Sequence, residues 1–169
     1  MRTTVILLIL AAMLGIWYYP LMPERMASHF GAGGEANGWK DKDSFFILYS
    51  AMFVLIGGMF AGIARAIRMF PDSMINIPHK EYWLAAERRH ESLDVMTGMM
   101  YHMGEATLVF ILALMLLTFE ANRNPDPVMG PVMGPASWVV IIVFLLVITW
   151  QSFRLVFFFK KPRAGQNVK

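Results

Sequence analysis

Residues 45–64 read FFILYSAMFVLIGGMFAGIA and contain no charged side chain. An uncharged apolar run of about 20 residues is long enough to cross the roughly 30 Å hydrocarbon core of a bilayer as an α-helix. The rest of the chain has the same character, because 57% of its 169 residues are hydrophobic and only 16% are charged. Soluble domains carry about 25% charged residues. This stretch therefore predicts a transmembrane helix in an integral membrane protein.

Three further runs predict transmembrane helices. The uncharged run at 106–119 is too short to span alone, so we extend its helix back to Val95, which takes His102 and Glu105 into the bilayer. The last run continues past Arg154, whose long side chain can reach the headgroups. A cleaved signal peptide is the alternative for the first run, although no small-residue cleavage site ends its apolar stretch. The four predicted spans are 3–22, 45–64, 95–119 and 137–159.

These spans predict an all-α bundle of four transmembrane helices that forms one membrane domain over residues 1–169. If the amino terminus is cytoplasmic, eleven of the 15 Lys and Arg residues lie on the cytoplasmic side and four on the other. We therefore expect both termini in the cytoplasm, with residues 23–44 and 121–136 outside. This bias explains the net charge of +3, so we expect no nucleic-acid partner. The absence of Cys excludes disulfides and thiolate metal sites.

The connection at residues 23–44, PERMASHFGAGGEANGWKDKDS, is more specific than a simple linker requires. Its start, Pro23–Arg25, suits a first helical turn, while Asn37-Gly38 favours a tight turn. Phe30 and Trp39 suit the headgroup zone and would fold this structured loop back onto the outer mouth of the bundle.

That path would bring His29 and Glu35 to the mouth of the bundle. The simplest interpretation is a self-capping turn in which His29 is hydrogen-bonded to the loop backbone. Recognition of a ligand or metal, and contact with a partner, remain open as alternatives.

Two motifs in the chain resemble those of a bacterial membrane family of unknown function, which also forms the amino-terminal half of SdpI-type toxin-immunity proteins. The first motif is Leu-Pro followed by His-aromatic-x-x-x-Gly-Glu-x-x-Gly-aromatic-x-x-Lys. This chain has Met22 in place of the Leu, and the other positions are matched by Pro23, His29, Phe30, Gly34, Glu35, Gly38, Trp39 and Lys42. The second motif is matched by Asn76, Pro78, Lys80, Tyr82, Trp83, Leu84, Glu87, Arg88 and Arg89. The resemblance implies a protein of the bacterial inner membrane and no particular reaction. The larger SdpI-type proteins carry membrane segments beyond the four predicted here.

The cytoplasmic connection after the second span contains Pro71 and Pro78, which break any continuous helix. We expect a new helix to begin near His79 and to lie at the membrane interface, because apolar residues recur among its charges at loosely helical spacing. Tyr82 and Trp83 should face the interface, while Arg88 and Arg89 reach headgroups or an acidic partner surface.

Polar residues follow one face of the third span, at Asp94, Tyr101 and Glu105, and His102 flanks them. A carboxylate in hydrocarbon is costly, so Glu105 should be protonated, paired with His102 or Arg154, or hydrated. A polar clamp between helices is the simplest interpretation of this row. A proton path or a metal site is the alternative, since carboxylate and imidazole are suitable ligands.

Close helix packing is expected at Gly58 and Gly62, which are four residues apart, with Gly98 on the facing helix. The 15 methionines suggest soft packing rather than copper handling.

No nucleotide-binding loop, nucleophile elbow or paired-histidine metal motif occurs in the sequence. We therefore expect a non-enzymatic membrane protein without a cofactor that protects, senses or accompanies another membrane component, such as a subunit of a larger complex. Its expected partners are membrane lipids and either another membrane protein or a peptide toxin. The alternatives are a membrane enzyme or carrier that uses His29, Glu35, His102 and Glu105, and a scaffold.

Overall fold

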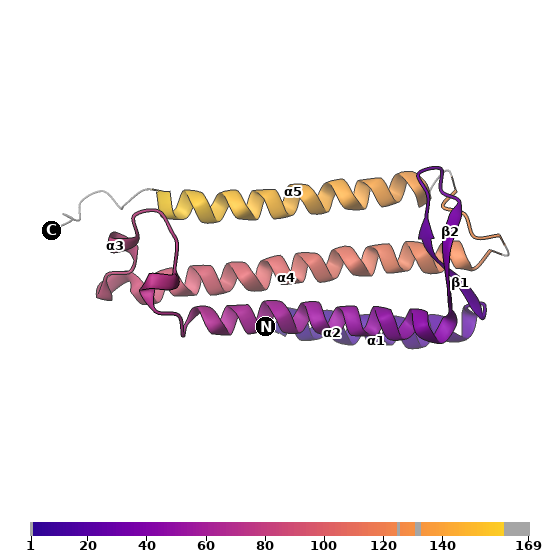
Figure 1. The fold of residues 1–169 in the computed structure, drawn as a ribbon, viewed down its shortest axis with the longest axis horizontal. Coiled ribbons are helices and arrows are strands. Elements are labelled where there is room, and N and C mark those ends of the chain that lie inside the picture. The colour runs from indigo at the N-terminus through magenta and orange to yellow at the C-terminus, as the bar shows by residue number, and fades with distance from the viewer. Residues whose placement is uncertain (1, 125, 131–132, 161–169) are drawn as a thin grey trace.

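The computed structural model describes residues 2–124, 126–130 and 133–160, and this part of the chain is mostly helical. Four helices dominate it (Figure 1), and each is long and apolar enough to cross a membrane. They are α1 (Arg2–Tyr18), α2 (Lys42–Ile67), α4 (Ala86–Asn122) and α5 (Met133–Lys160). Three predicted spans each lie within one of these helices, and the first, 3–22, ends one residue past the short 3-10 turn η1 (Tyr19–Leu21) that follows α1. The fold is consistent with a multi-pass membrane protein.

Helix α4 is central, because it packs against α1, α2 and α5. Helix α1 runs parallel to it, and α2 and α5 run antiparallel to it. Four side chains that are at most 1% exposed form the centre of the main core: Met26, Phe45, Leu108 and Phe119. The Phe119 ring stacks on the rings of Tyr18 and Phe46. Aromatic packing therefore joins α1, α2 and α4 near one end of the bundle.

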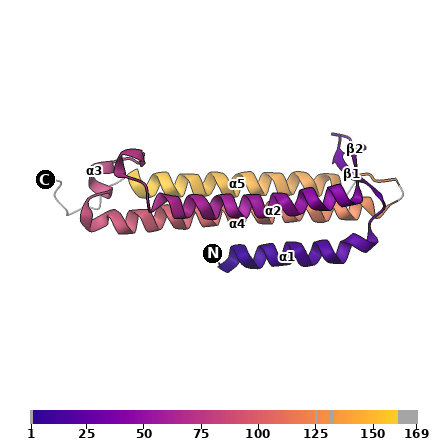
Figure 2. The same ribbon diagram turned by 60° about the horizontal axis from the view of Figure 1, so that its bottom comes forward.

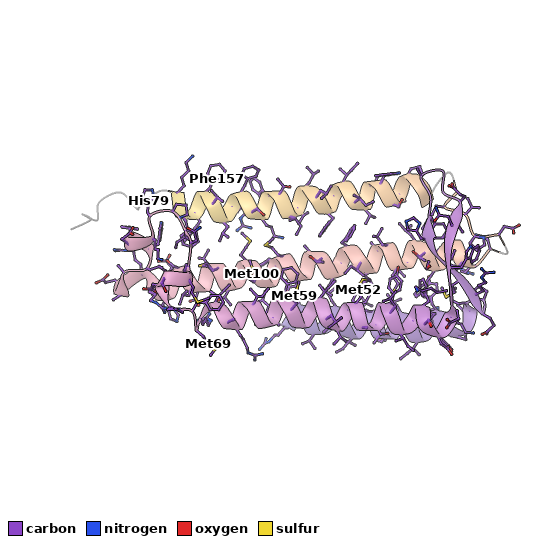
Figure 3. All side chains as sticks on the ribbon, in the orientation of Figure 1. Met52, Met59, Met69, His79, Met100 and Phe157 are labelled. Atoms are coloured by element: carbon purple, nitrogen blue, oxygen red, sulfur yellow. The ribbon has the colours of Figure 1, made fainter. Side chains whose placement is uncertain are left out.

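The outer faces of the helices are apolar and exposed, as expected for surfaces that contact lipid. Along α5 the exposed side chains include Val139, Leu146 and Phe157. Phe157 and Met69 both point away from the bundle (Figure 3), with 61% and 83% of their surface exposed.

The glycines that allow close helix packing are not the predicted ones. A Cβ at Gly104 would lie 2.7 Å from Phe60 Cβ, and a Cβ at Gly57 would lie 3.5 Å from the methyl groups of Leu8. By contrast, a Cβ at Gly58, Gly62 or Gly98 would meet nothing within 4 Å in the described residues. Spacing alone could not distinguish these faces, because adjacent glycines on α2 point in directions about 100° apart.

One end of the bundle, here called the hairpin end, carries a β-hairpin beside the α4–α5 connection (Figure 1). Strands β1 (Arg25–Phe30) and β2 (Ala36–Asp41) pair antiparallel, with register irregularities around His29. The expected all-α fold thus includes a small sheet. The expected helical turn at Pro23–Arg25 is wrong, because Arg25 already pairs with Asp41 as the first residue of β1.

The opposite end carries short elements between α2 and α4, namely η2 (Asp72–Met74) and the single turn α3 (Lys80–Trp83). His79, at the start of α3, has a left-handed backbone with φ +52°. A non-helical turn at Leu84 and Ala85 separates α3 from α4. The expected new helix near His79 therefore begins as predicted but ends after one turn.

Helix α4 has 37 residues and is about 55 Å long, so it extends well past the amino-terminal end of α1 (Figures 1 and 2). The Thr4 hydroxyl, close to the start of α1, donates to Glu105 Oε1 at 3.4 Å. Glu105 and Asn122 are about 25 Å apart along α4, which is slightly less than one hydrocarbon thickness. If the span ends at Asn122, Glu105 lies near the opposite membrane boundary, where a carboxylate reaches water at little cost.

Candidate functional site

The hairpin end gathers every residue of the first sequence motif. The hairpin turn is closed by two backbone bonds, from Gly31 N–H to the Glu35 carbonyl at 2.8 Å and from Gly34 N–H to the Gly31 carbonyl at 2.9 Å. Gly34 has φ +88°, a conformation that residues with a Cβ rarely adopt. Gly34 of the motif is therefore required by the shape of the turn.

A loop of the α4–α5 connection holds the tip of the hairpin. Met129 N–H donates to the Gly34 carbonyl at 2.8 Å, and Glu35 forms a β-bridge with Val128. A Cβ on Gly34 would lie 2.4 Å from the Met129 carbonyl oxygen, so the two backbones can meet only at glycine. This contact joins segments that are more than 90 residues apart in the sequence.

The middle of β1 is held by Asn122, the last residue of α4. Its side-chain Oδ1 accepts from Ala27 N–H at 2.7 Å, and its Nδ2 donates to the Ala27 carbonyl at 2.9 Å. The same Nδ2 also donates to the Thr118 carbonyl at 2.9 Å. Ala27 is fully buried and Asn122 is 2% exposed. The asparagine amide thus pairs with β1 as a neighbouring strand would.

Sequence reasoning did not identify Asn122. The only signal was an amide at the end of an apolar run, which does not distinguish a helix terminus from a strand anchor.

The base of the hairpin is tied to the start of α2. Lys42 Nζ bonds Glu24 Oε1 at 2.7 Å, Lys42 N–H donates to the Glu24 carbonyl at 2.9 Å, and its ammonium lies 4.9 Å from the centre of the Tyr19 ring. Asp41 caps α2 by accepting from Ser44 N–H at 2.8 Å. That hydrogen bond lowers the pKa of the Asp41 carboxyl. Lys42 therefore has a structural role here.

Four motif residues are exposed: Pro23 at the base of the hairpin, and His29, Glu35 and Trp39 on the hairpin itself. His29 Nδ1 is hydrogen-bonded to the Asn37 side chain, so its partner is a side chain rather than the loop backbone expected from the sequence. Gly38 allows this, because a Cβ there would lie 2.8 Å from His29 Cβ.

A hollow of about 1000 Å³ lies between the hairpin tip and the first turns of α5. The backbone of Gly31–Gly34 forms one wall, and Phe30, Met129, Trp138 and Ile141 supply apolar walls. A surface of this kind offers backbone hydrogen-bonding groups beside aromatic rings, which suits an extended peptide segment.

The second motif forms a brace at the other end of the bundle. Tyr82 and Trp83 are 4% and 2% exposed, so the expected contact with the membrane interface is wrong. Both pack on Phe159, and Trp83 Nε1 donates to the Phe159 carbonyl at 2.9 Å. The aromatic pair is buried because α5 extends far enough to cover it.

Arg88 and Arg89 are also used inside the fold. Arg88 Nε donates to the Tyr82 carbonyl at 2.7 Å, and its guanidinium lies 4.0 Å from the centre of the Tyr82 ring. Arg89 Nε pairs with Asp72 Oδ1 at 2.9 Å. Their expected role in reaching headgroups or a partner therefore has little support in this geometry. Asn76, Pro78 and Glu87 are the exposed members of the motif.

The polar residues of α4 are distributed along the helix rather than gathered in one site. Asp94 pairs with Arg68 of α2 and with His90 Nδ1, the latter at 3.0 Å. Tyr101 is half-buried and His102 is exposed. The Arg68–Asp94 pair fits the polar clamp between helices that the sequence favoured.

The four residues proposed for a metal or proton site do not come together. His29 and Glu35 belong to the hairpin, which Asn122 holds. Glu105 and His102 lie about 25 Å and about 30 Å from Asn122 along α4. Within residues 2–124, 126–130 and 133–160, no group of three or more His, Asp or Glu side chains could hold a metal ion.

Comparison with known proteins matches part of the chain to a family model. No curated protein and no solved structure matches the chain significantly. Residues 6–53 match the family model described as Domain of unknown function (DUF1648). The match covers most of α1, the whole hairpin and the first half of α2, so the braced hairpin and the helices that carry it are the part of this chain similar to DUF1648.

Proposed function

We propose that this chain is a non-enzymatic membrane protein that binds another membrane component at its hairpin end. The observation that carries the proposal is that the residues of the first motif have two different roles. Gly34, Gly38 and Lys42 hold the hairpin in place, while His29, Glu35 and Trp39 stay exposed. A preformed surface of this kind binds without the cost of ordering a flexible loop.

The proposed partner is a peptide toxin or an extended segment of another membrane protein. The hollow beside the hairpin tip supports this choice, because its glycine backbone and the rings of Phe30 and Trp138 suit an extended chain. The motif resemblance to SdpI-type immunity proteins supports a protective or accessory role. The match of residues 6–53 to DUF1648, a domain of unknown function, includes the first motif but indicates no role of its own.

The proposed location is the bacterial inner membrane, with the hairpin end outside. The distribution of Lys and Arg supports this orientation, because among the described residues only Arg25, Lys40, Lys42 and Arg123 belong to the hairpin end. A cysteine at exposed Ala32, in this chain without native Cys, should react with an impermeant maleimide added to intact spheroplasts. Reaction only after lysis would reverse the orientation.

The test of binding is photo-crosslinking in living cells. A photoreactive residue at Ala32, at the rim of the hollow, should give an adduct of defined mass, and one at lipid-facing Val156 should not. His29→Ala should abolish the adduct without changing the melting temperature, because His29 is exposed. Lys40→Ala, an exposed change on the same hairpin, is the matched control.

Two outcomes would contradict the proposal. A large drop in melting temperature for His29→Ala would make this residue a structural brace. The same adduct with both His29→Ala and Lys40→Ala would move the binding surface away from the exposed motif residues.

A further inference from the structure

A second cleft lies at the hairpin end, on the side of the hairpin that faces the end of α1. Its volume is about 350 Å³, and it is separate from the hollow at the hairpin tip, since the two share no lining residue. Its walls come from the α1–β1 junction, from β2 and from the end of α4. Pro23 and Trp39 of the first motif line it, whereas its two arginines, Arg25 and Arg123, belong to neither motif.

The charge of this cleft is one-sided. Arg25 and Arg123 line it, and no Asp or Glu does so among the described residues. The surrounding surface is different, because Glu24, Asp41 and Glu120 all lie on adjacent elements. Two guanidinium groups that line one cleft are a typical arrangement for binding an oxyanion.

Arg25 is held in position but keeps hydrogen-bonding capacity. Its guanidinium carbon lies 5.3 Å from the centre of the Trp39 ring, a cation–π contact that leaves N–H groups available to a ligand. Although Asp41 is its partner in the strand register, no ion pair joins them in the structure of residues 2–124, 126–130 and 133–160. Arg123 pairs with Glu120 at 3.1 Å but is 56% exposed, so it can also turn to a ligand.

The depth of the cleft indicates the source of the anion. Leu21, at the end of the first span, and Asn122, at the end of the third, both line it. The cleft therefore lies where the headgroup zone meets the hydrocarbon, and exposed Leu21 offers an apolar wall to an acyl chain. Trp39 beside it has the amphipathic character of side chains at this level.

We propose that this cleft binds the phosphate of an anionic lipid headgroup, with Arg25 as the principal ligand, Arg123 as the second and Trp39 as the residue that positions Arg25. The site shares Trp39 with the partner surface proposed above, but its ligands Arg25 and Arg123 do not belong to that surface. The two tests change different residues, His29 in one and Arg25 and Arg123 in the other, so failure of one proposal is distinguishable from failure of the other.

The experiment is native mass spectrometry of the purified full-length protein titrated with phosphatidylglycerol and, in parallel, with zwitterionic phosphatidylcholine. The wild type should retain phosphatidylglycerol preferentially. Arg25→Gln and Arg123→Gln should each raise the apparent Kd by about tenfold, as expected for loss of a charge-assisted hydrogen bond. Lys40→Gln removes an equal charge from the same hairpin outside the cleft and should leave the Kd unchanged.

Arg123→Gln keeps the test valid if Arg25→Gln disturbs the hairpin, because Arg123 lies just beyond α4 and outside the sheet. Equal weakening by Lys40→Gln would reduce the effect to general electrostatics and overturn the site. If the protein retains the two lipids equally, and inorganic phosphate displaces them, then the anion that binds in the cleft is not a lipid headgroup. If Arg25→Gln and Arg123→Gln bind lipid as the wild type does, and a bound protein instead protects Arg25, then the ligand of the cleft is a protein and not a lipid.

Discussion

The contact between Asn122 and Ala27 should contribute most of the stability that holds the hairpin on the bundle. Asn122→Ala removes the side-chain partners of the Ala27 N–H and C=O, in a position where Ala27 is 0% exposed. Leaving a buried backbone group unsatisfied costs about 1–3 kcal/mol, so the two groups together predict a local loss of about 2–6 kcal/mol. The Thr118 carbonyl adds little to this sum, because helical bonding can still satisfy it.

Hydrogen exchange with mass spectrometry measures this loss directly. A local destabilisation of about 2 kcal/mol makes amide hydrogen exchange through local opening about 30-fold faster. Peptides covering β1 should therefore exchange at least that much faster in Asn122→Ala than in the wild type. Asn124→Ala is the control, because Asn124 is exposed and its environment predicts a change within about 0.5 kcal/mol. Exchange of β1 that rises less than threefold, with the helices unchanged, would refute the role assigned to Asn122.

Three further predictions concern single positions. Gly34→Ala should detach the hairpin tip and expose it to protease, because the positive φ of Gly34 and the nearby Met129 carbonyl exclude a Cβ. Gly58→Ala is the control and should leave the protease pattern unchanged. Gly104→Ala should lower the stability of the bundle by about 1–3 kcal/mol relative to Gly58→Ala, measured as detergent-solution melting, because α2 must move to admit the methyl group. Asp41→Ala should lower the melting temperature at neutral pH. The lowered pKa of Asp41 means that its stabilisation is complete above the ordinary value of 3.8 and is lost as the pH falls through the folded-state pKa, so the difference from wild type should close in acid.

Arg88 and Arg89 illustrate how the structure changes the expected result of an experiment. From the sequence, replacing both by Glu should preserve insertion and weaken partner binding. In the structure Arg89 holds Asp72 and the Phe70 carbonyl, while Arg88 holds the Tyr82 carbonyl. We now expect the double substitution to loosen the connection between α2 and α4. Retention of the wild-type melting temperature would contradict this structural role.

Sequence by itself determined the number and placement of the four long helices. Uncharged runs of about 20 residues have few stable conformations in hydrocarbon other than a helix, since every backbone group must be bonded within the segment. It also indicated that residues 23–44 form a specific structure, because glycines and an Asn-Gly pair have local conformational preferences that do not depend on the rest of the chain.

The tertiary structure determined the contacts that local conformational preferences do not specify. Asn122, 95 residues away from Ala27, supplies the hydrogen-bond partners of the inner edge of strand β1, and no local pattern encodes such a pairing. Likewise Trp83 has the composition of an interfacial anchor but is buried, because α5 happens to reach it. Helix rotation relative to the neighbouring helices decides whether Gly57 or Gly58 packs against another helix. Helix length decides how far His29 lies from Glu105. Those quantities are set by the packing of all four helices together, which is why only the assembled bundle fixes them.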